Sequence, residues 1–106
     1  MTTENIQVQL RKGVLELCVL SILEKGEKYP SDILVELHNA KLIVVEGTLY
    51  PLLMRLKNDE ILTYRWVESL SGPPRKYYRL TENGIQHLQN YRKAWFALIQ
   101  IVEKLS

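Results

Sequence analysis

The stretch from Glu46 to Leu80, EGTLYPLLMRLKNDEILTYRWVESLSGPPRKYYRL, decides the fold of this chain. The stretch begins with leucines at helical spacing. A run follows in which apolar and polar residues alternate and aromatic and β-branched residues are frequent. After a Gly-Pro-Pro step comes a second run that is basic and aromatic. No residues in the stretch have the spacing of a nucleophile or metal motif. It therefore predicts a helix followed by a β-hairpin, with a binding role rather than a catalytic one.

The helix expected over 46–59 has a core-facing side and an open side. Four leucines follow the i, i+3, i+4, i+7 rule and face the core: Leu49, Leu52, Leu53 and Leu56. An outer face that is low in bulk and edged by hydrogen-bond donors suits entry into a DNA major groove, and an ordinary solvent-exposed face is the alternative. This face consists of Gly47, Pro51, Met54 and Asn58, flanked by Thr48 and Arg55 on one edge and by Tyr50 and Lys57 on the other.

The two runs after this helix predict an antiparallel hairpin. Residues 61–70 and 75–80 are the expected strands, and Ser-Gly-Pro-Pro at 71–74 is the expected turn. A helix that enters a groove, followed by a hairpin that lies on the neighbouring DNA backbone, is the layout of a winged helix.

Charge is unevenly distributed along the chain. Residues 1–45 carry a net charge of −1, whereas residues 46–80 carry +2. Within the second segment Arg75, Lys76 and Arg79 fall close together. A basic patch on a near-neutral body is typical of a small DNA-binding domain, and a solvated hairpin is the alternative.

Length and composition exclude several classes of protein. The 106 residues predict one domain with one appended element. The single cysteine, Cys18, excludes an intramolecular disulfide and a cysteine metal site, and we interpret it as a small core residue rather than a redox sensor. No apolar run approaches about 18 residues, and the N-terminus lacks a signal-peptide pattern. We therefore expect a cytoplasmic protein without a membrane span, metal or cofactor.

Two helices are expected before residue 46. Leu10–Leu23 is apolar nearly all round, which predicts a buried helix. Gly26, in the turn over 24–30, is the expected stop signal. Residues 31–40 form the second expected helix, with Ser31 as its N-cap.

Thr81 is expected to cap a last helix that runs to the C-terminus, roughly 35 Å long at about 1.5 Å per residue. Its apolar residues are spaced 3-4-3-4-3, which makes a seam of nearly three heptads. A chain of this size offers few partners for such a seam, so we expect a second copy to cover it, with packing on the first helix as the alternative. The seam residues are Leu88, Tyr91, Trp95, Leu98, Val102 and Leu105.

Two strings in combination, GTLYPLLMRL at 47–56 and RKYYRLTENG at 75–84, resemble the PadR family of bacterial transcriptional repressors. The chain looks most like the short, multidrug-responsive members, and the resemblance extends from Leu10 to Ser106. It departs from the family at Glu60, where members usually have glycine after the recognition helix. It also departs at the wing tip, where Ser-Gly-Pro-Pro should be stiffer than a glycine-rich turn.

The resemblance implies a mainly helical fold with a small β-hairpin: a winged helix-turn-helix domain at 1–80 and a C-terminal dimerisation helix at 81–106. It implies a homodimer that binds a pseudo-palindromic double-stranded DNA operator. The implied DNA contacts are Thr48, Tyr50 and Arg55 on the recognition helix, with Pro51 beside them on the same outer face, and Arg75 and Lys76 on the wing.

Trp95 matches a tryptophan that, in the multidrug-responsive members, flanks a pore at the dimer centre and stacks on flat aromatic drugs. The resemblance thus implies a planar aromatic effector, or a phenolic one as in other members, that changes the distance between the two recognition helices. A tryptophan that fills the dimer core without a ligand is the alternative.

Two other classes of function compete with this interpretation. A winged helix can serve as a protein-interaction module without DNA or ligand binding, because fold does not fix function. An enzyme would have to use His38, His87 or the twelve carboxylates, none of which lies in a catalytic or metal motif.

Overall fold

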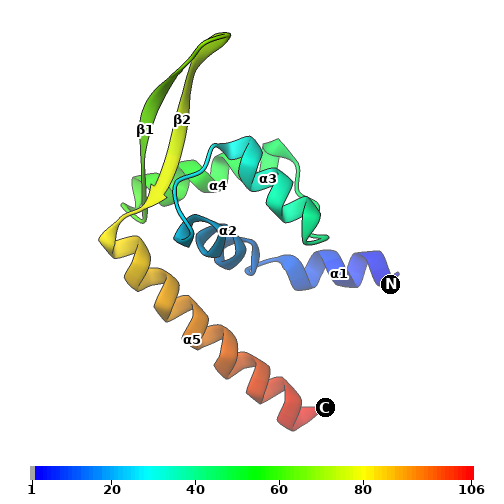
Figure 1. The fold of residues 1–106 in the computed structure, drawn as a ribbon. Helices are drawn as coiled ribbons and strands as arrows, with labels where there is room; N and C mark the ends of the chain where they lie inside the picture. The colour runs from blue at the N-terminus through cyan, green and yellow to red at the C-terminus, as the bar shows by residue number, and fades with distance from the viewer. Residues whose placement is uncertain (1) are drawn as a thin grey trace.

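The computed structural model describes residues 2–106 of the protein (Figure 1). As predicted, the fold is mainly helical and has one β-hairpin. Its elements are α1 (Thr3–Arg11), α2 (Leu15–Glu24), α3 (Pro30–Asn39), α4 (Glu46–Asn58), β1 (Leu62–Ser69), β2 (Gly72–Leu80) and α5 (Glu82–Leu105).

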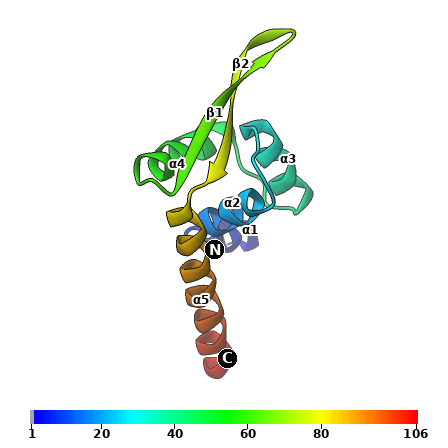
Figure 2. The same cartoon turned by 60° about the vertical axis from the view of Figure 1, so that its left-hand side comes forward.

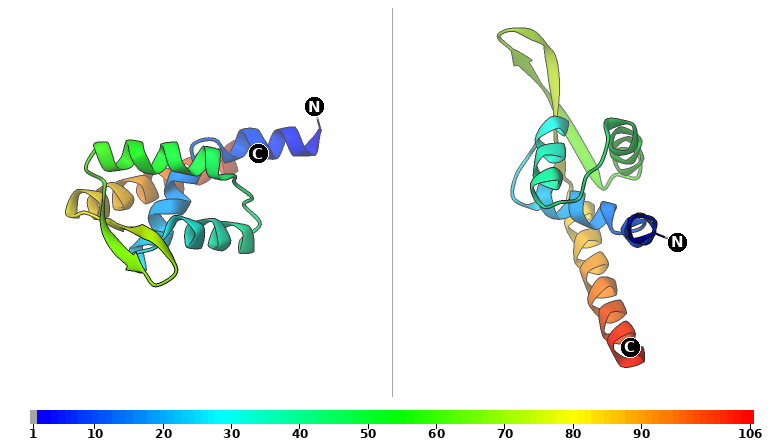
Figure 3. Two further views of the ribbon diagram at one scale, coloured as in Figure 1. Left: turned by 90° about the horizontal axis from the view of Figure 1, so that it is seen from above. Right: turned by 90° about the vertical axis from the view of Figure 1, so that its right-hand side faces the viewer.

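The molecule is elongated, with principal extents of 53 × 32 × 21 Å. α2, α3 and α4 form a central body, from which the hairpin projects at one end and α5 at the other (Figures 1 and 2). Seen from the hairpin end, α3, α4 and the hairpin lie nearest to the viewer, and α1 extends to one side (Figure 3). The two long projections therefore leave the body in opposite directions.

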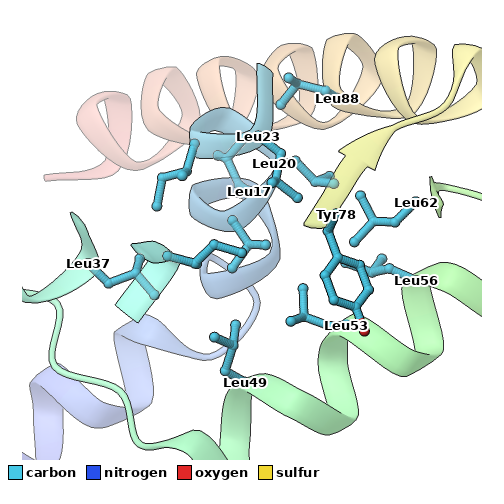
Figure 4. Close-up of a cluster of buried hydrophobic side chains, with 13 residues drawn as sticks. Leu17, Leu20, Leu23, Leu37, Leu49, Leu53, Leu56, Leu62, Tyr78 and Leu88 are labelled. Carbon is cyan, nitrogen blue, oxygen red and sulfur yellow. The ribbon is translucent and has the colours of Figure 1, made fainter. Parts of the chain in front are cut away.

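The hydrophobic core surrounds α2, with α5 on one side and α4 on the other (Figure 4). Val19 and Leu20 of α2 are fully buried. α4 contributes three of the four predicted leucines as buried residues, and Leu52 is half-buried against the same cluster. The buried hydrophobic core residues outside α2 are Ile33, Leu37, Leu49, Leu53, Leu56, Leu62, Tyr78 and Leu88.

The predicted continuous helix Leu10–Leu23 is wrong, because the chain breaks between α1 and α2. Gly13 takes a φ of +86°, in the left-handed region that glycine adopts without steric cost. Burial is confirmed only for α2, since α1 has no buried residue. Cys18 packs against the core as predicted, and burial raises the pKa of its thiol.

The next helix, α3, begins one residue earlier than predicted. Its N-cap is Tyr29 rather than Ser31, and Pro30 occupies the first helical position, which requires no N–H donor. The Asp32 carboxylate accepts a hydrogen bond from the Tyr29 N–H at 3.3 Å. Pro30 thus sets the start of the helix, and Ser31 lies exposed inside it.

The second strand of the hairpin is longer than predicted, and the first is shorter by one residue at each end. Ser69 pairs with Gly72, so the turn is Leu70–Ser71 and the expected turn at 71–74 is wrong. The register is irregular opposite Pro73 and Pro74, since proline has no N–H to donate to the ladder. At the base of the hairpin, Lys28 pairs antiparallel with Tyr78 through backbone hydrogen bonds of 2.8 and 3.0 Å, which ties the hairpin to the α2–α3 loop.

Thr81 caps α5 as predicted: its Oγ1 accepts a hydrogen bond from the Gly84 N–H at 2.9 Å. A Cβ at Gly84 would lie 2.1 Å from the Ile61 carbonyl oxygen, so glycine permits this close approach of α5 to the residue just before β1. Leu88 then joins the core, and Arg92 forms two hydrogen bonds of 2.9 Å with the Glu24 carboxylate of α2. The first half of α5 is therefore part of the body, and its second half projects.

Candidate nucleic-acid interface

The outer face of α4 is open to solvent along its whole length. Leu49, Leu53 and Leu56 hold the opposite side of the helix in the core. Glycine at position 47 adds no bulk, and apart from its chain neighbours and the adjoining backbone of α4, no atom lies within 4 Å of the place where its Cβ would be. The exposed residues of this face are Gly47, Thr48, Tyr50, Pro51, Met54, Lys57 and Asn58.

Pro51 lies inside α4, one turn after the helix begins at Glu46. Because proline has no N–H, the carbonyl oxygen of Gly47 loses its usual helical donor. That carbonyl lies on the exposed face of the first turn, where water or a ligand can satisfy it. The position of this proline on the outer face agrees with the helical pattern of the sequence.

Tyr50 lies beside Pro51 with 42% of its surface exposed. Partial burial and the Glu46 carboxylate raise the pKa of its phenol above the usual value of 10. The hydroxyl therefore remains protonated at neutral pH and can donate a hydrogen bond.

Arg55, in contrast, is already engaged within the chain. Its Nη2 lies 2.5 Å from Oε1 of Glu16 on α2, and its Nη1 lies 3.7 Å from Asp59. Glu16 also binds Nε2 of His87 on α5 at 2.7 Å. One carboxylate thus joins α2, α4 and α5, and Arg55 does not extend freely toward the outer face.

The hairpin has two chemically different faces. On the face toward α4, Trp66 pairs with Lys76 and Tyr64 pairs with Tyr78. The Lys76 Nζ lies 4.6 Å from the centroid of the Tyr64 ring. This face carries exposed aromatic surface together with a cation.

The other face packs against the α2–α3 loop. The Arg75 guanidinium stacks on Tyr29 at 4.7 Å from the ring centroid, and Arg65 forms an ion pair of 2.5 Å with Glu27. Tyr77 lies 6.0 Å from Tyr29, centroid to centroid. Arg75 and Lys76, both predicted as wing contacts, therefore lie on opposite faces of the hairpin.

The predicted seam of α5 is divided between two environments. Leu88 is 1% exposed in the chain's own core, so its predicted place in a dimer interface is wrong. Tyr91 is half-buried, and its hydroxyl donates a hydrogen bond to the Gly13 carbonyl. The start of α5 packs on α2, so this part of the seam is already covered within a single chain. The exposed remainder comprises Trp95, Leu98, Val102 and Leu105.

Trp95 lies where two grooves meet. One groove of about 640 Å³ runs between the α1–α2 junction and the second half of α5, where it is lined by Val14, Leu98 and Val102. The other, of about 540 Å³, is lined by Cys18, Leu37 and Phe96. The indole is thus flanked by apolar surface on two sides.

Within residues 2–106, no group of three or more His, Cys, Asp or Glu side chains is placed to hold a metal ion. Over the same residues, no helix combines the length and the apolar character needed to cross a membrane.

Several residues of this surface escaped sequence reasoning. Glu16 and Arg55 are 39 positions apart, and nothing in their spacing signals the ion pair. Lys57 of α4 places its Nζ 5.9 Å from the centroid of the Tyr64 ring on the hairpin, and the strand pattern gives no signal of this contact either. Such pairings depend on the angle between elements, which alternation within one strand does not determine.

The body, the recognition-type helix and the hairpin define a winged-helix protein. Residues 19–90 match the family described as the transcriptional regulator PadR-like family. The chain therefore belongs to the PadR-like transcriptional regulators, and its family consists of regulators rather than enzymes.

Solved structures support this assignment across nearly the whole chain. The chain is similar to a PadR-like transcription factor from Bacteroides fragilis, with 52% identity, a TM-score of 0.82, and coverage of 96% of this chain and 99% of the other. A PadR family regulator from Eggerthella lenta is 33% identical, with a TM-score of 0.90 and coverage of 96% and 89%. Bacillus subtilis PadR, solved in complex with operator DNA, is 27% identical over 74% of this chain and 46% of its own length, with a TM-score of 0.69.

Proposed function

We propose that the protein is a homodimeric transcriptional repressor that binds operator DNA through α4. The observation that carries this proposal is the open outer face of α4 beside a projecting hairpin with cations on both faces. Thr48, Tyr50 and Pro51 would meet base edges, because they lie on that face near the N-terminus of the helix. The complex of Bacillus subtilis PadR with operator DNA supports the same use of this fold.

In this proposal the wing contacts phosphates. Arg75 and Lys76 supply charge from the two faces of the hairpin, so they strengthen binding without reading sequence. Arg55 contributes only when its guanidinium exchanges Glu16 for DNA, since the two contacts compete for the same donors. Thr48 and Tyr50 therefore carry most of the sequence preference.

The dimer would form through the projecting half of α5. Trp95, Leu98, Val102 and Leu105 leave a row of apolar surface exposed, and a second copy of the helix would bury it. A two-fold dimer would present two copies of α4 to successive major grooves, roughly 34 Å apart.

The proposed effector is a planar aromatic or phenolic compound at the dimer interface. Trp95 offers a partly exposed indole between two apolar grooves, which suits stacking on a flat ring. A ligand there would alter the separation of the two α5 helices and hence of the two α4 helices. The repressor would then leave its operator, because both half-sites could no longer be occupied together.

A gel-shift with DNA from upstream of the gene for this chain tests the DNA-binding part. We expect a salt-sensitive shift at submicromolar protein concentration and altered sequence preference after Thr48→Ala or Tyr50→Phe. Arg75→Ala and Lys76→Ala should instead weaken binding to all sequences by similar factors. Absence of any shift below micromolar protein, with a folded dimer, would favour the protein-interaction module instead.

A further inference from the structure

A groove lies between the end of α1 and the loop that leads from α3 into α4, and we call it the α1–α4 groove. Its volume is about 470 Å³, which is within the range of small-molecule sites. Seen from the hairpin end, the end of α1 lies beside the start of α4 (Figure 3). The apolar residues that line the groove are Val8, Leu15, Leu42, Ile43, Val44 and Val45.

Much of this apolar lining is exposed in the chain. Val8 is 53% exposed, Ile43 64% and Val45 67%, so two separate segments leave apolar surface around one groove. The apolar lining residues are all aliphatic. They can pack along an alkyl chain, whereas a flat aromatic ring would find no ring on which to stack. The α1–α4 groove differs in this respect from the two grooves beside Trp95.

The charged residues that line the groove are two cations, Arg11 and Lys12. Arg11, in the last turn of α1, is half-buried. The ion pairs found within residues 2–106 all use other cations, so neither Arg11 nor Lys12 is neutralised by a carboxylate of the described chain. A guanidinium presents a planar set of donors that matches a carboxylate, and a half-buried one is less screened by water. The groove therefore has the charge of a site for an anion.

We propose that the α1–α4 groove binds a medium-chain fatty acid. The carboxylate pairs with Arg11, Lys12 adds a second positive charge, and the alkyl chain packs on the exposed surface of Ile43 and Val45.

Occupancy of the groove also affects α4. Thr48 lines the groove and lies on the outer face of the helix, so a bound alkyl chain crowds a side chain that would meet base edges. The fatty acid therefore lowers operator affinity. This second part rests on the proposed DNA-binding function, whereas binding of the fatty acid does not.

Isothermal titration calorimetry of the full-length protein with decanoate, below its critical micelle concentration, tests the site. We expect decanoate to bind and decyltrimethylammonium, which has the same chain length and the opposite charge, not to bind. Two-dimensional NMR spectra of the backbone amides locate the bound molecule. The resonances of Gly13, Ile43 and Val45 should shift with decanoate, since these residues line the groove.

Two pairs of variants separate the head of the ligand from its tail. Arg11→Gln should weaken decanoate binding by about tenfold, because it removes a charge-assisted contact. Arg79→Gln is the matched control, since it makes the same change at an exposed residue on the hairpin. Ile43→Ser should weaken binding by about fivefold through lost apolar contact, whereas Ile85→Ser, at an exposed isoleucine on α5, should not. Circular dichroism confirms that each variant is folded.

A gel-shift titration with DNA from upstream of the gene measures the effect on α4. Decanoate should lower the affinity of the wild type for this DNA and should have about tenfold less potency on Arg11→Gln, in line with its weaker binding.

Three results would overturn the fatty-acid site. The first is absence of decanoate binding, or equal binding of decyltrimethylammonium. The second is binding that survives Arg11→Gln but is lost in Trp95→Leu, which would place decanoate in the grooves beside Trp95. The third is an Ile43→Ser variant that is monomeric where the wild type is dimeric, because a second copy of the chain would then cover the groove.

The outcomes also separate this site from the repressor proposal. If decanoate binds through Arg11 and the wild type binds no operator DNA, the site stands and the repressor proposal fails. If both bind but decanoate leaves operator affinity unchanged, the effect on α4 is overturned and the repressor proposal stands.

Discussion

At the scale of single residues, Glu16 links three helices through one carboxylate. Burial raises the pKa of Glu16, but hydrogen bonds from His87 and Arg55 outweigh burial and bring that pKa below its usual value of 4.5. A carboxyl with a lower pKa in the folded state stabilises the fold above its unfolded pKa, and this contribution disappears as the pH falls through the folded pKa. Part of the stability of this protein should therefore be lost below about pH 4.5.

Glu16→Gln tests this dependence. At pH 7 the variant should be less stable than the wild type by about 1 kcal/mol, since both partners of the carboxylate are partly exposed. The difference should shrink as the pH falls below about 4.5, because only the wild type then loses an ionised group. Chemical denaturation at fixed protein concentration measures both values, and Arg55, His87, Asp59 and Tyr91 are the other titratable groups at this junction.

A stability difference that stays constant from pH 7 to pH 3 would contradict the role given to Glu16. Repeating the comparison in a His87→Gln background, which keeps a hydrogen-bond donor, shows how much of the difference depends on the His87 side chain.

Trp95 allows a test of the proposed effector site at the same scale. Trp95 is 37% exposed and lies between two grooves, so a flat aromatic compound can stack on its indole. Planar aromatic compounds that do so should quench the fluorescence of Trp95. Titration of the Trp66→Phe variant follows Trp95 alone. Absence of quenching across a set of planar aromatics, or quenching of the wild type that survives Trp95→Ala, would exclude stacking on Trp95.

At the scale of elements, local signals explain what the sequence predicts well. Leucine spacing located α4 to within one residue, and Thr81 marked the start of α5. The errors lie where one residue overrides a periodic pattern. Gly13 interrupts an apolar run that continues on both sides of it, and Pro30 starts α3 before the serine that resembled a cap.

Glu60, just beyond the end of α4, has an unfavourable backbone conformation. Glu60 follows the helix with a φ of +62°, and the next residue, Ile61, donates its N–H to the Leu56 carbonyl at 2.9 Å. This left-handed cap favours glycine, because a Cβ crowds the neighbouring carbonyl there. Glycine would adopt this conformation without that steric cost.

Glu60→Gly should stabilise the protein by about 0.5–1 kcal/mol, since it relieves the left-handed strain at that residue. Thermal denaturation measures the gain. Glu60→Ala removes the same carboxylate but keeps a Cβ, so it should not reproduce the effect. Equal melting temperatures for the glycine and alanine variants would mean that charge, and not backbone conformation, controls stability at this site.

At the scale of the whole molecule, the sequence predicts which surfaces of the helices are exposed or apolar better than it predicts which residues of different elements contact each other. The open face of α4 follows from helical periodicity, and the apolar end of α5 follows from heptad spacing. The Glu16 junction and the pairing of Arg65 with Glu27 join residues far apart in the chain. Such contacts depend on how rigid elements dock, so they appear only in three dimensions.

Leu98→Glu tests whether two copies associate through the projecting half of α5. Leu98 is 52% exposed in the single chain, and in the proposed dimer a carboxylate at this position would be buried without a partner. We therefore expect the wild type to sediment as a dimer and Leu98→Glu as a monomer. Operator affinity should fall by roughly a hundredfold or more, because a monomer loses the effective concentration that links two half-sites.

Ile85→Glu is the matched control for this change, since it places the same charge on the same helix at a residue of similar exposure, 48%, outside the seam. It should remain a dimer and keep its operator affinity. A wild type that stays monomeric at micromolar concentration, or a Leu98→Glu variant that stays dimeric, would place the interface elsewhere on the chain. Loss of dimer in both variants would instead mean that added negative charge anywhere on α5, and not burial at Leu98, disrupts association.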